Sequence, residues 1–233
     1  QICPQHNKLE RLYFDAIAFV HEPESVELMV KELLEKRATG TRAALYSAAF
    51  SFVSRPNMKA IQALEPLFRA SEAHMSSAKL SAASMVNKYC RQNPHCYDEA
   101  PVRNLAQALK HDVEEDFSPN SNEESQEKAL SAFKSLGNMG VTTPEVSEAV
   151  MRYVRKENKK VNIRVAAAQS FRLARCESSV TQQLVDFALR PGKNTEVRIA
   201  CYLAAVRCAN FEHLQEIVAN ISSEENTQVR GFI

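Results

Sequence analysis

Glycine and tryptophan are scarce in this sequence, which has 5 glycines and no tryptophan among its 233 residues. It also lacks the alternating runs of Val, Ile and Thr that are typical of β-strands. The mean hydropathy is -0.33, and no apolar run approaches the roughly 18 residues that suggest a membrane-spanning helix. These absences leave little room for a sheet and favour a water-soluble, all-α protein.

An excess of charge of one sign is also absent. The chain carries 29 Lys and Arg against 28 Asp and Glu, a net charge of +1. Strong electrostatic attraction to nucleic acid or to anionic membranes needs a marked basic excess. We therefore expect no nucleic-acid partner.

The motifs of common enzymes are missing as well. There is no glycine-rich phosphate loop, no HExxH and no GxSxG, and the six histidines are scattered. His111 and Asp112, followed by acidic residues 114–116, form a possible metal cluster, but a solvated helix end explains them better. We expect no catalytic residues, no cofactor and no metal site.

What the sequence does contain is a repeat. The stretch from Asn194 to Cys208 returns in part at residues 226–230 and has a relative at residues 162–168. Its arginines, Arg164, Arg198 and Arg230, stand 34 and 32 positions apart. A fixed period in the range of about 20–50 residues is typical of stacked helix pairs.

Each copy has the pattern of a helix packed on nearly all sides, because apolar residues and alanines surround the arginine. Asn194 and Asn226 stand where an Asn side chain can cap the first free N–H groups. The pattern predicts a right-handed α-solenoid of antiparallel helix pairs, with the three arginines at equivalent positions. We expect residues 1–233 to form one elongated domain.

Helix signals recur along the whole chain. Thr143, Ser25, Ser179 and Asn210 are expected to cap helices, and Pro66 is expected to kink or divide one. The predicted helices are 8–20, 25–37, 41–53, 57–70, 75–91, 101–112, 123–136, 144–156, 161–175, 179–190, 195–208, 211–221 and 227 onward.

Two charged segments stand out. Residues 113–122 are acidic and rich in Ser and Asn, which predicts a solvated surface loop that divides the chain; a processing or partner site is the alternative. The basic run Arg152, Arg155, Lys156, Lys159 and Lys160 is expected to be an exposed helix face and helix end, with phosphate or an acidic partner as the alternative.

Six cysteines are present. Cys90 and Cys96 flank a short loop after a helix, which is good geometry for a disulfide. Cys176 and Cys208 end corresponding helices of adjacent copies, so their side chains could meet. Neighbouring helix axes lie about 8–10 Å apart, whereas the two Cα atoms of a disulfide lie within about 7 Å of each other. A bridge therefore requires the chain to converge at the helix ends. Cys201 is expected to be a buried thiol, and Cys3 has no assigned partner.

Disulfides would place the protein outside the cytosol. In that setting Asn220-Ile221-Ser222 becomes an N-glycosylation sequon at Asn220. The chain begins without Met and stops within an expected helix, so we interpret it as a fragment of a much larger chain.

Several of these motifs together resemble the helical domain of the large lipid transfer proteins, the family of vitellogenins, apolipophorins and apolipoprotein B. The resemblance extends from about residue 80 and is carried by residues 136–140, 164–176, 196–208 and 226–229, in that order. The Cys90–Cys96 pair resembles a disulfide of the family. Cysteines at the positions of Cys176 and Cys208 resemble apolipophorin and crustacean lipoprotein sequences, whereas Ala209 stands where related sequences often have proline.

The resemblance implies a two-layered helical arch, a lipovitellin-like superhelical domain that braces the sheets around a lipid cavity in a secreted, glycosylated lipoprotein. Such a lipid carrier either feeds embryos as a nutrient reservoir or supplies circulating fuel. Its implied partners are lipids bound by the rest of the parent chain, other domains of that chain, and a second copy or a lipoprotein receptor. The alternative is an intracellular HEAT-like interaction scaffold, which six free thiols would favour.

Overall fold

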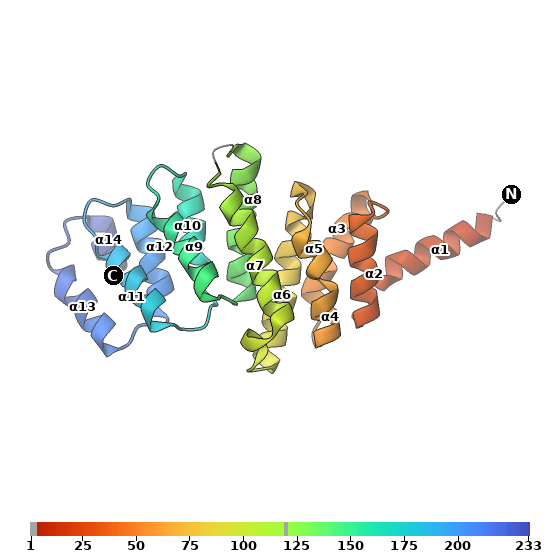
Figure 1. The fold of residues 1–233 in the computed structure, drawn as a ribbon, viewed down its shortest axis with the longest axis horizontal. Coiled ribbons are helices and arrows are strands. Elements are labelled where there is room, and N and C mark those ends of the chain that lie inside the picture. Colours follow the sequence, from red (N-terminus) through yellow and green to blue (C-terminus); the bar gives the residue numbers. More distant parts are fainter. Residues whose placement is uncertain (1–3, 119–120) are drawn as a thin grey trace. The chain divides into compact units, whose positions relative to one another are not determined.

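The computed structural model describes residues 4–118 and 121–233, and all regular structure in those ranges is helical. The predicted all-α class is therefore confirmed (Figure 1). Cys3 and two residues of the expected acidic loop, Pro119 and Asn120, lie outside the described residues. Among the described helices, none is both long and apolar enough to cross a bilayer.

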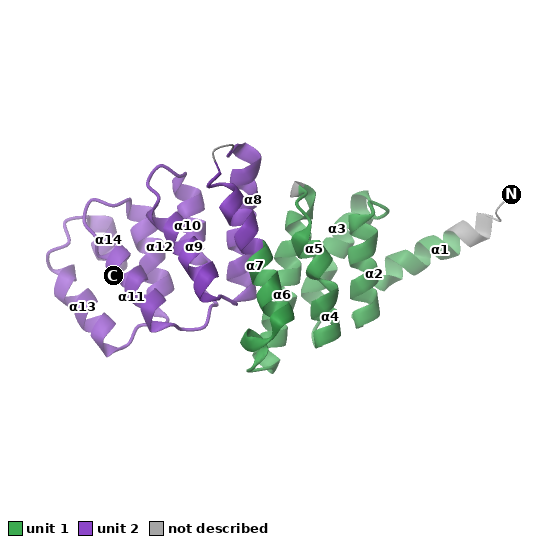
Figure 2. Ribbon diagram, in the orientation of Figure 1, with its two compact units in different colours: residues 1–108 green, residues 109–233 purple. Residues whose placement is uncertain are grey.

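The chain divides into two compact units, residues 1–108 and residues 109–233 (Figure 2). The first contains six complete α-helices, three short 3-10 helices and the beginning of α7. These are α1 (Pro4–Ile17), α2 (Pro23–Leu34), α3 (Gly40–Ala49), η1 (Phe50–Phe52), α4 (Met58–Ala63), α5 (Glu65–Arg69), η2 (Ala73–Met75), α6 (Ser76–Gln92), η3 (Cys96–Asp98) and α7 (Ala100–Glu115).

Helix α6 is the centre of the first unit, where it contacts α3, α4, α5 and η1. Its inward positions are small or flexible, and Ala78, Ala82 and Met85 are fully buried. Pro66 divides the predicted fourth helix as expected, because it stands in the first turn of α5, two residues after the break at Leu64.

The second unit continues from α7 with seven helices. They are α8 (Glu123–Met139), α9 (Pro144–Arg155), α10 (Val161–Gln169), α11 (Ser178–Ala188), α12 (Thr195–Val206), α13 (Phe211–Ile221) and α14 (Thr227–Phe232). Helix α10 contacts α8, α9 and α12, while α12 also contacts α11 and α14, and α11 contacts α13. The even-numbered helices therefore form one row. The odd-numbered helices from α9 onward form the other, since a side-chain hydrogen bond from Arg155 to Gln183 joins α9 to α11 and α11 contacts α13.

Four of the expected helix caps are confirmed. The side chains of Asn194, Asn226, Thr143 and Asn210 each accept a hydrogen bond from a backbone N–H in the first turn of the helix that follows. Asn210 also forms a capping box with His213, whose Nδ1 accepts from the Asn210 backbone N–H at 3.2 Å.

Two expected caps are wrong. Helix α2 begins at Pro23, two residues before Ser25, because proline's fixed φ suits the first helical turn. The Ser25 hydroxyl instead donates to the Glu22 carbonyl at 2.7 Å. Helix α11 begins at Ser178, so Ser179 lies inside it, and no side chain caps this helix.

One helix ends much earlier than predicted. Helix α10 ends at Gln169 and not at residue 175. The Ser170 N–H bonds both the Ala166 and Ala167 carbonyls, and the Phe171 N–H bonds the Ala168 carbonyl, so the last turn tightens. The buried Ser170 hydroxyl also donates to the Ala167 carbonyl at 2.7 Å, which competes with continuation of the helix.

Candidate functional site

The repeat arginines are structural side chains of the second unit. Arg164 and Arg198 are 3% and 2% exposed. The Nε of Arg164 donates to the Val154 carbonyl at 2.9 Å, and the Nε of Arg198 donates to the Ala188 carbonyl at 2.7 Å. Each acceptor stands ten residues earlier, at the end of the preceding helix, so each arginine fastens its own helix to the helix before it.

The third arginine has a different environment. Arg230 is exposed, and its Nη1 lies 3.5 Å from the Glu224 carbonyl. The predicted equivalence therefore holds for Arg164 and Arg198, and Arg230 departs from it.

The outer ends of the two buried guanidinium groups also differ. The Nη atoms of Arg198 bind the Glu224 carboxylate, with Nη1 at 3.3 Å from Oε1. The hydrogen bond from Arg198 lowers the pKa of Glu224 despite the opposing effect of burial. Arg164 has no equivalent carboxylate, its Nη2 is buried without a hydrogen-bond partner, and desolvation lowers its pKa.

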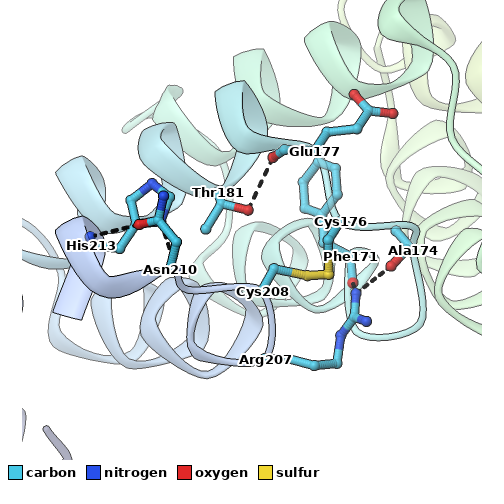
Figure 3. The surroundings of a disulfide bond; sticks show 9 residues. All are labelled: Phe171, Ala174, Cys176, Glu177, Thr181, Arg207, Cys208, Asn210 and His213. Atoms are coloured by element: carbon cyan, nitrogen blue, oxygen red, sulfur yellow. Dashed lines mark hydrogen bonds between the residues drawn. A yellow bond between two sulfur atoms is a disulfide. The ribbon is translucent and has the colours of Figure 1, made fainter.

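A disulfide joins adjacent copies at one edge of the unit. The Cys176 and Cys208 sulfurs are bonded, with Cα atoms 5.3 Å apart. Figure 3 shows Arg207 beside this bond, where its Nη2 donates to the carbonyls of Phe171 and Ala174. The early end of α10 explains how the chain converges, since residues 170–176 turn toward the end of α12.

A second arginine connects the same turn to α8. The Nη2 of Arg172 donates to the Lys134 carbonyl at 3.3 Å and to the Asn138 side chain. Its guanidinium lies so close to Gly137 that an added Cβ would stand 1.8 Å from Nη1. Glycine is required there for this contact, and desolvation lowers the pKa of Arg172.

The first unit has its own disulfide. Cys90 and Cys96 are bonded, with Cα atoms 5.2 Å apart, and the Asn93 side chain in the intervening loop donates to the Tyr89 carbonyl at 2.9 Å. The Tyr89 hydroxyl donates to Glu99 at 3.1 Å. Desolvation and this bond raise the pKa of Tyr89 to about 12. Cys201 is a free buried thiol, as predicted, and burial raises its pKa to about 12.

The acidic loop is shorter and better anchored than expected. Residues 113–115 belong to α7, and Asp116 is fully buried. Its carboxylate accepts from the Tyr153 hydroxyl at 2.6 Å and pairs with Lys159 at 2.7 Å. Burial raises the pKa of Asp116, but hydrogen bonds from Lys159, Ser121 and Tyr153 outweigh this effect and lower it overall. The local sequence predicts a solvated carboxylate, because Tyr153 and Lys159 stand far from Asp116 in the chain.

The basic run faces this acidic segment. The Arg152 guanidinium stacks on the Phe117 ring at 4.3 Å and lies 3.6 Å from Glu114, and Lys160 lies 3.9 Å from Glu123. The expectation of an exposed helix face and helix end is therefore wrong for Lys159, whose side chain is 14% exposed. Much of the basic charge is neutralised within the unit.

The remaining candidate residues offer little chemistry. Asn220 is exposed near the end of α13, and its Nδ2 donates to the Glu216 carbonyl at 2.8 Å. Within the described ranges no three His, Cys, Asp or Glu side chains stand together as a metal site. An open groove of about 1240 Å³ in the first unit has charged walls that include Glu32, Arg37 and Arg42.

Comparisons with known proteins point in one direction. The family model described as the vitellogenin TPR domain matches residues 1–233. A vitellogenin of Penaeus merguiensis is 50% identical over 231 residues, which cover 99% of this chain and 9% of the relative. Apolipophorins of Drosophila melanogaster are 29% identical over 161 residues, which cover 66% of this chain and 4% of the relative.

Apolipoprotein B-100 of Homo sapiens is 25% identical over 177 residues, which cover 74% of this chain and 4% of the relative. The chain thus spans less than a tenth of the length of these relatives. No solved structure matches it.

Proposed function

Because this chain belongs to the vitellogenin TPR domain family, we propose that it is a helical structural domain of a secreted lipid-transport lipoprotein. In this role it braces the sheets that enclose the lipid and performs no covalent chemistry. The observation that carries the proposal is the match over residues 1–233, together with 50% identity to a vitellogenin. Lipid is bound by the rest of the parent protein, whose further partners are a second copy or a receptor.

The proposal includes the arrangement of the helices as a right-handed α-solenoid of antiparallel pairs. Support comes from the second unit, where α8, α10, α12 and α14 contact one another in sequence. Arg164 ties α10 to α9 and Arg198 ties α12 to α11, in each case by a hydrogen bond from Nε to a backbone carbonyl. Such an array fills its interior with its own side chains, as the buried Ala167 and Ala200 illustrate.

Secretion is supported by the two disulfides, because such bonds persist in oxidising compartments. The same bonds, with the family match, favour a lipid carrier over an intracellular scaffold. In a secreted protein the exposed Asn220 is accessible for glycosylation.

The test compares lipid on residues 1–233 expressed alone with lipid on the parent protein. We expect the short protein to be helical by circular dichroism and nearly free of extractable lipid, because its helices bury their apolar faces against one another. Stoichiometric lipid on residues 1–233 would contradict the bracing role and make the domain a carrier itself.

A packing variant separates bracing from lipid binding in the parent. Ala204 is buried and Leu203 is half exposed on the same helix. Ala204→Leu overfills a helix contact at a cost of about 1–3 kcal/mol, whereas Leu203→Ala serves as the matched control. Lipid loss should accompany loss of helix in the first variant; lipid loss with the fold intact would indicate a direct lipid contact.

A further inference from the structure

The odd-numbered row of the second unit repeats one helix register. Helices α9, α11 and α13 follow the cap positions Thr143, Glu177 and Asn210. The fourth, eighth and eleventh residues after each cap share one face of the helix, because 3.6 residues make a turn. We call this the forward face. It comprises Ser147, Met151 and Val154 in α9, Thr181, Val185 and Ala188 in α11, and Leu214, Val218 and Ile221 in α13.

Two hydrogen bonds show where the forward face points. Arg155, twelve positions after the cap of α9, donates to Gln183 of α11. Gln182, five positions after the cap of α11, donates to Glu216 of α13 at 3.0 Å. Positions five and twelve lie about 60° and about 40° from position eight, both on the same side of the helix, so position eight is on the side of the helix that faces the next helix of the row. The forward face of each helix is thus directed at the next helix of the row.

The burial of this face changes at α13. The eighth position is 1% exposed in α9 and in α11, at Met151 and Val185, but 69% exposed at Val218. The fourth position is buried at Ser147 and Thr181 but 44% exposed at Leu214. Phe211, at the start of the same face, is 73% exposed. Helix α13 lies at the edge of the second unit (Figure 1).

We propose that the forward face of α13 is an interface for one further helix of the same repeat, supplied by another part of the parent chain. This rests on the proposed function, in which the chain is a domain of a larger lipoprotein. The face offers Leu214 and Val218 as apolar contacts and the exposed Gln215 as a hydrogen-bond donor at the position that Gln182 occupies in α11. The incoming helix therefore carries apolar residues and, at its sixth position, an acceptor equivalent to Glu216.

Charge favours a protein helix over a lipid surface as the occupant. Helix α13 carries Glu212 and Glu216 and no Lys or Arg, whereas helices that lie on membrane surfaces are typically rich in Lys and Arg. The matched stretch is 9% of the length of the vitellogenin relative, so a parent of that size has ample chain to supply the helix.

The glycosylation sequon is compatible with this interface. Asn220 stands two residues after Val218, which places it about 160° around the helix from that exposed side chain. A glycan at Asn220 would extend away from the incoming helix.

Photo-crosslinking in the full parent protein tests the proposal. Val218→p-benzoylphenylalanine places the reactive group on the forward face, and Ala219→p-benzoylphenylalanine is the matched control, since Ala219 is also exposed but lies on another side. We expect the probe at position 218 to crosslink to a helix elsewhere in the same chain. The probe at position 219 should not form that product. A crosslink to a second copy, to lipid alone, or to nothing would overturn the interface.

Lipid content measured on the same samples distinguishes the two levels of the proposal. Normal lipid with no intramolecular crosslink at position 218 contradicts the interface and leaves the lipoprotein function in place. A parent without lipid contradicts the proposed function itself. Hydrogen exchange supplies a second readout, because α13 amides should be better protected in the parent than in residues 1–233 expressed alone.

Discussion

The copy that contains Arg164 and the copy that contains Arg198 use the same backbone bond but differ at the outer end of the arginine. Glu224, in the loop after α13, binds the Arg198 guanidinium. The corresponding loop after α11, residues 189–194, contains Arg190 and Lys193 and no acidic residue, and Lys193 pairs with Glu157. Arg164 is therefore buried with one Nη without a partner.

This difference separates two roles of the repeat arginine. The hydrogen bond from Nε to a carbonyl ten residues earlier is common to both copies, so it belongs to the fold of each helix pair. The carboxylate contact occurs at Arg198 alone of the two, so it adds stability to one copy. Experiments that remove one contact at a time can measure the two contributions.

Removal of the arginines should have the largest effect. Arg198→Met leaves the Glu224 carboxylate without its partner, and breaking a buried charge pair in this way costs about 3–5 kcal/mol. Arg164→Met leaves only the Val154 carbonyl unpaired, which costs about 1–3 kcal/mol. Native-state hydrogen exchange of the α10 and α12 amides measures both free energies of opening.

The double variant Arg198→Met with Glu224→Gln provides the control. Because it removes both charges, it should recover part of the stability that Arg198→Met loses. Equal costs for Arg164→Met and Arg198→Met would show that the ion pair contributes nothing beyond the shared backbone bond.

The two disulfides extend the comparison to the two units. The Cys176–Cys208 bond spans 32 positions and the Cys90–Cys96 bond spans 6. The loss of loop entropy in the unfolded chain predicts stabilisation of about 4 and about 2 kcal/mol, respectively. We therefore expect Cys176→Ser/Cys208→Ser to destabilise the second unit more than Cys90→Ser/Cys96→Ser destabilises the first. Urea unfolding of the two variants measures both losses.

Non-reduced peptide mapping is the companion measurement. It should recover both pairs from native protein, with Cys201 alkylated only after unfolding because its thiol is buried. Alkylation of Cys90 or Cys176 in native, unreduced protein would contradict the corresponding bond and weaken the extracellular assignment.

Local sequence signals account for much of the fold. The arginine spacing identified the copies, and the caps at Asn194 and Thr143 located helix starts, because both signals act within a few residues of where they appear. The helix pattern predicts too late an end for α10, because the buried Ser170 side chain donates to a carbonyl of the preceding turn. Its burial depends on packing that the helix pattern does not specify.

The electrostatic contacts were harder to predict, because they join residues far apart in the chain. The local sequence predicts that Asp116 lies in a solvated loop, yet its partners Tyr153 and Lys159 stand 37 and 43 positions away. Glu224 lies 26 positions after Arg198, and no motif links the two. The difference between Arg164 and Arg198 was likewise hidden, since both stand in closely similar local sequences.

Acid should produce the smallest of these effects, and it should separate the same two copies. The pKa of Glu224 is lowered from its ordinary value of 4.5 by the hydrogen bond from Arg198. A carboxylate with a lowered pKa stabilises the fold above its ordinary pKa and loses that contribution as pH falls through the lowered value. Protection of the α12 amides should therefore decrease below about pH 4.5, by less than in Arg198→Met, because a protonated Glu224 still occupies its site. Asp116 gives α9 a response of the same sign, since its pKa is also lowered. Glu224→Gln should therefore flatten the pH profile of α12 protection and leave the profile of α9 unchanged. An unchanged α12 profile in this variant would show that the carboxylate charge is not what holds Arg198.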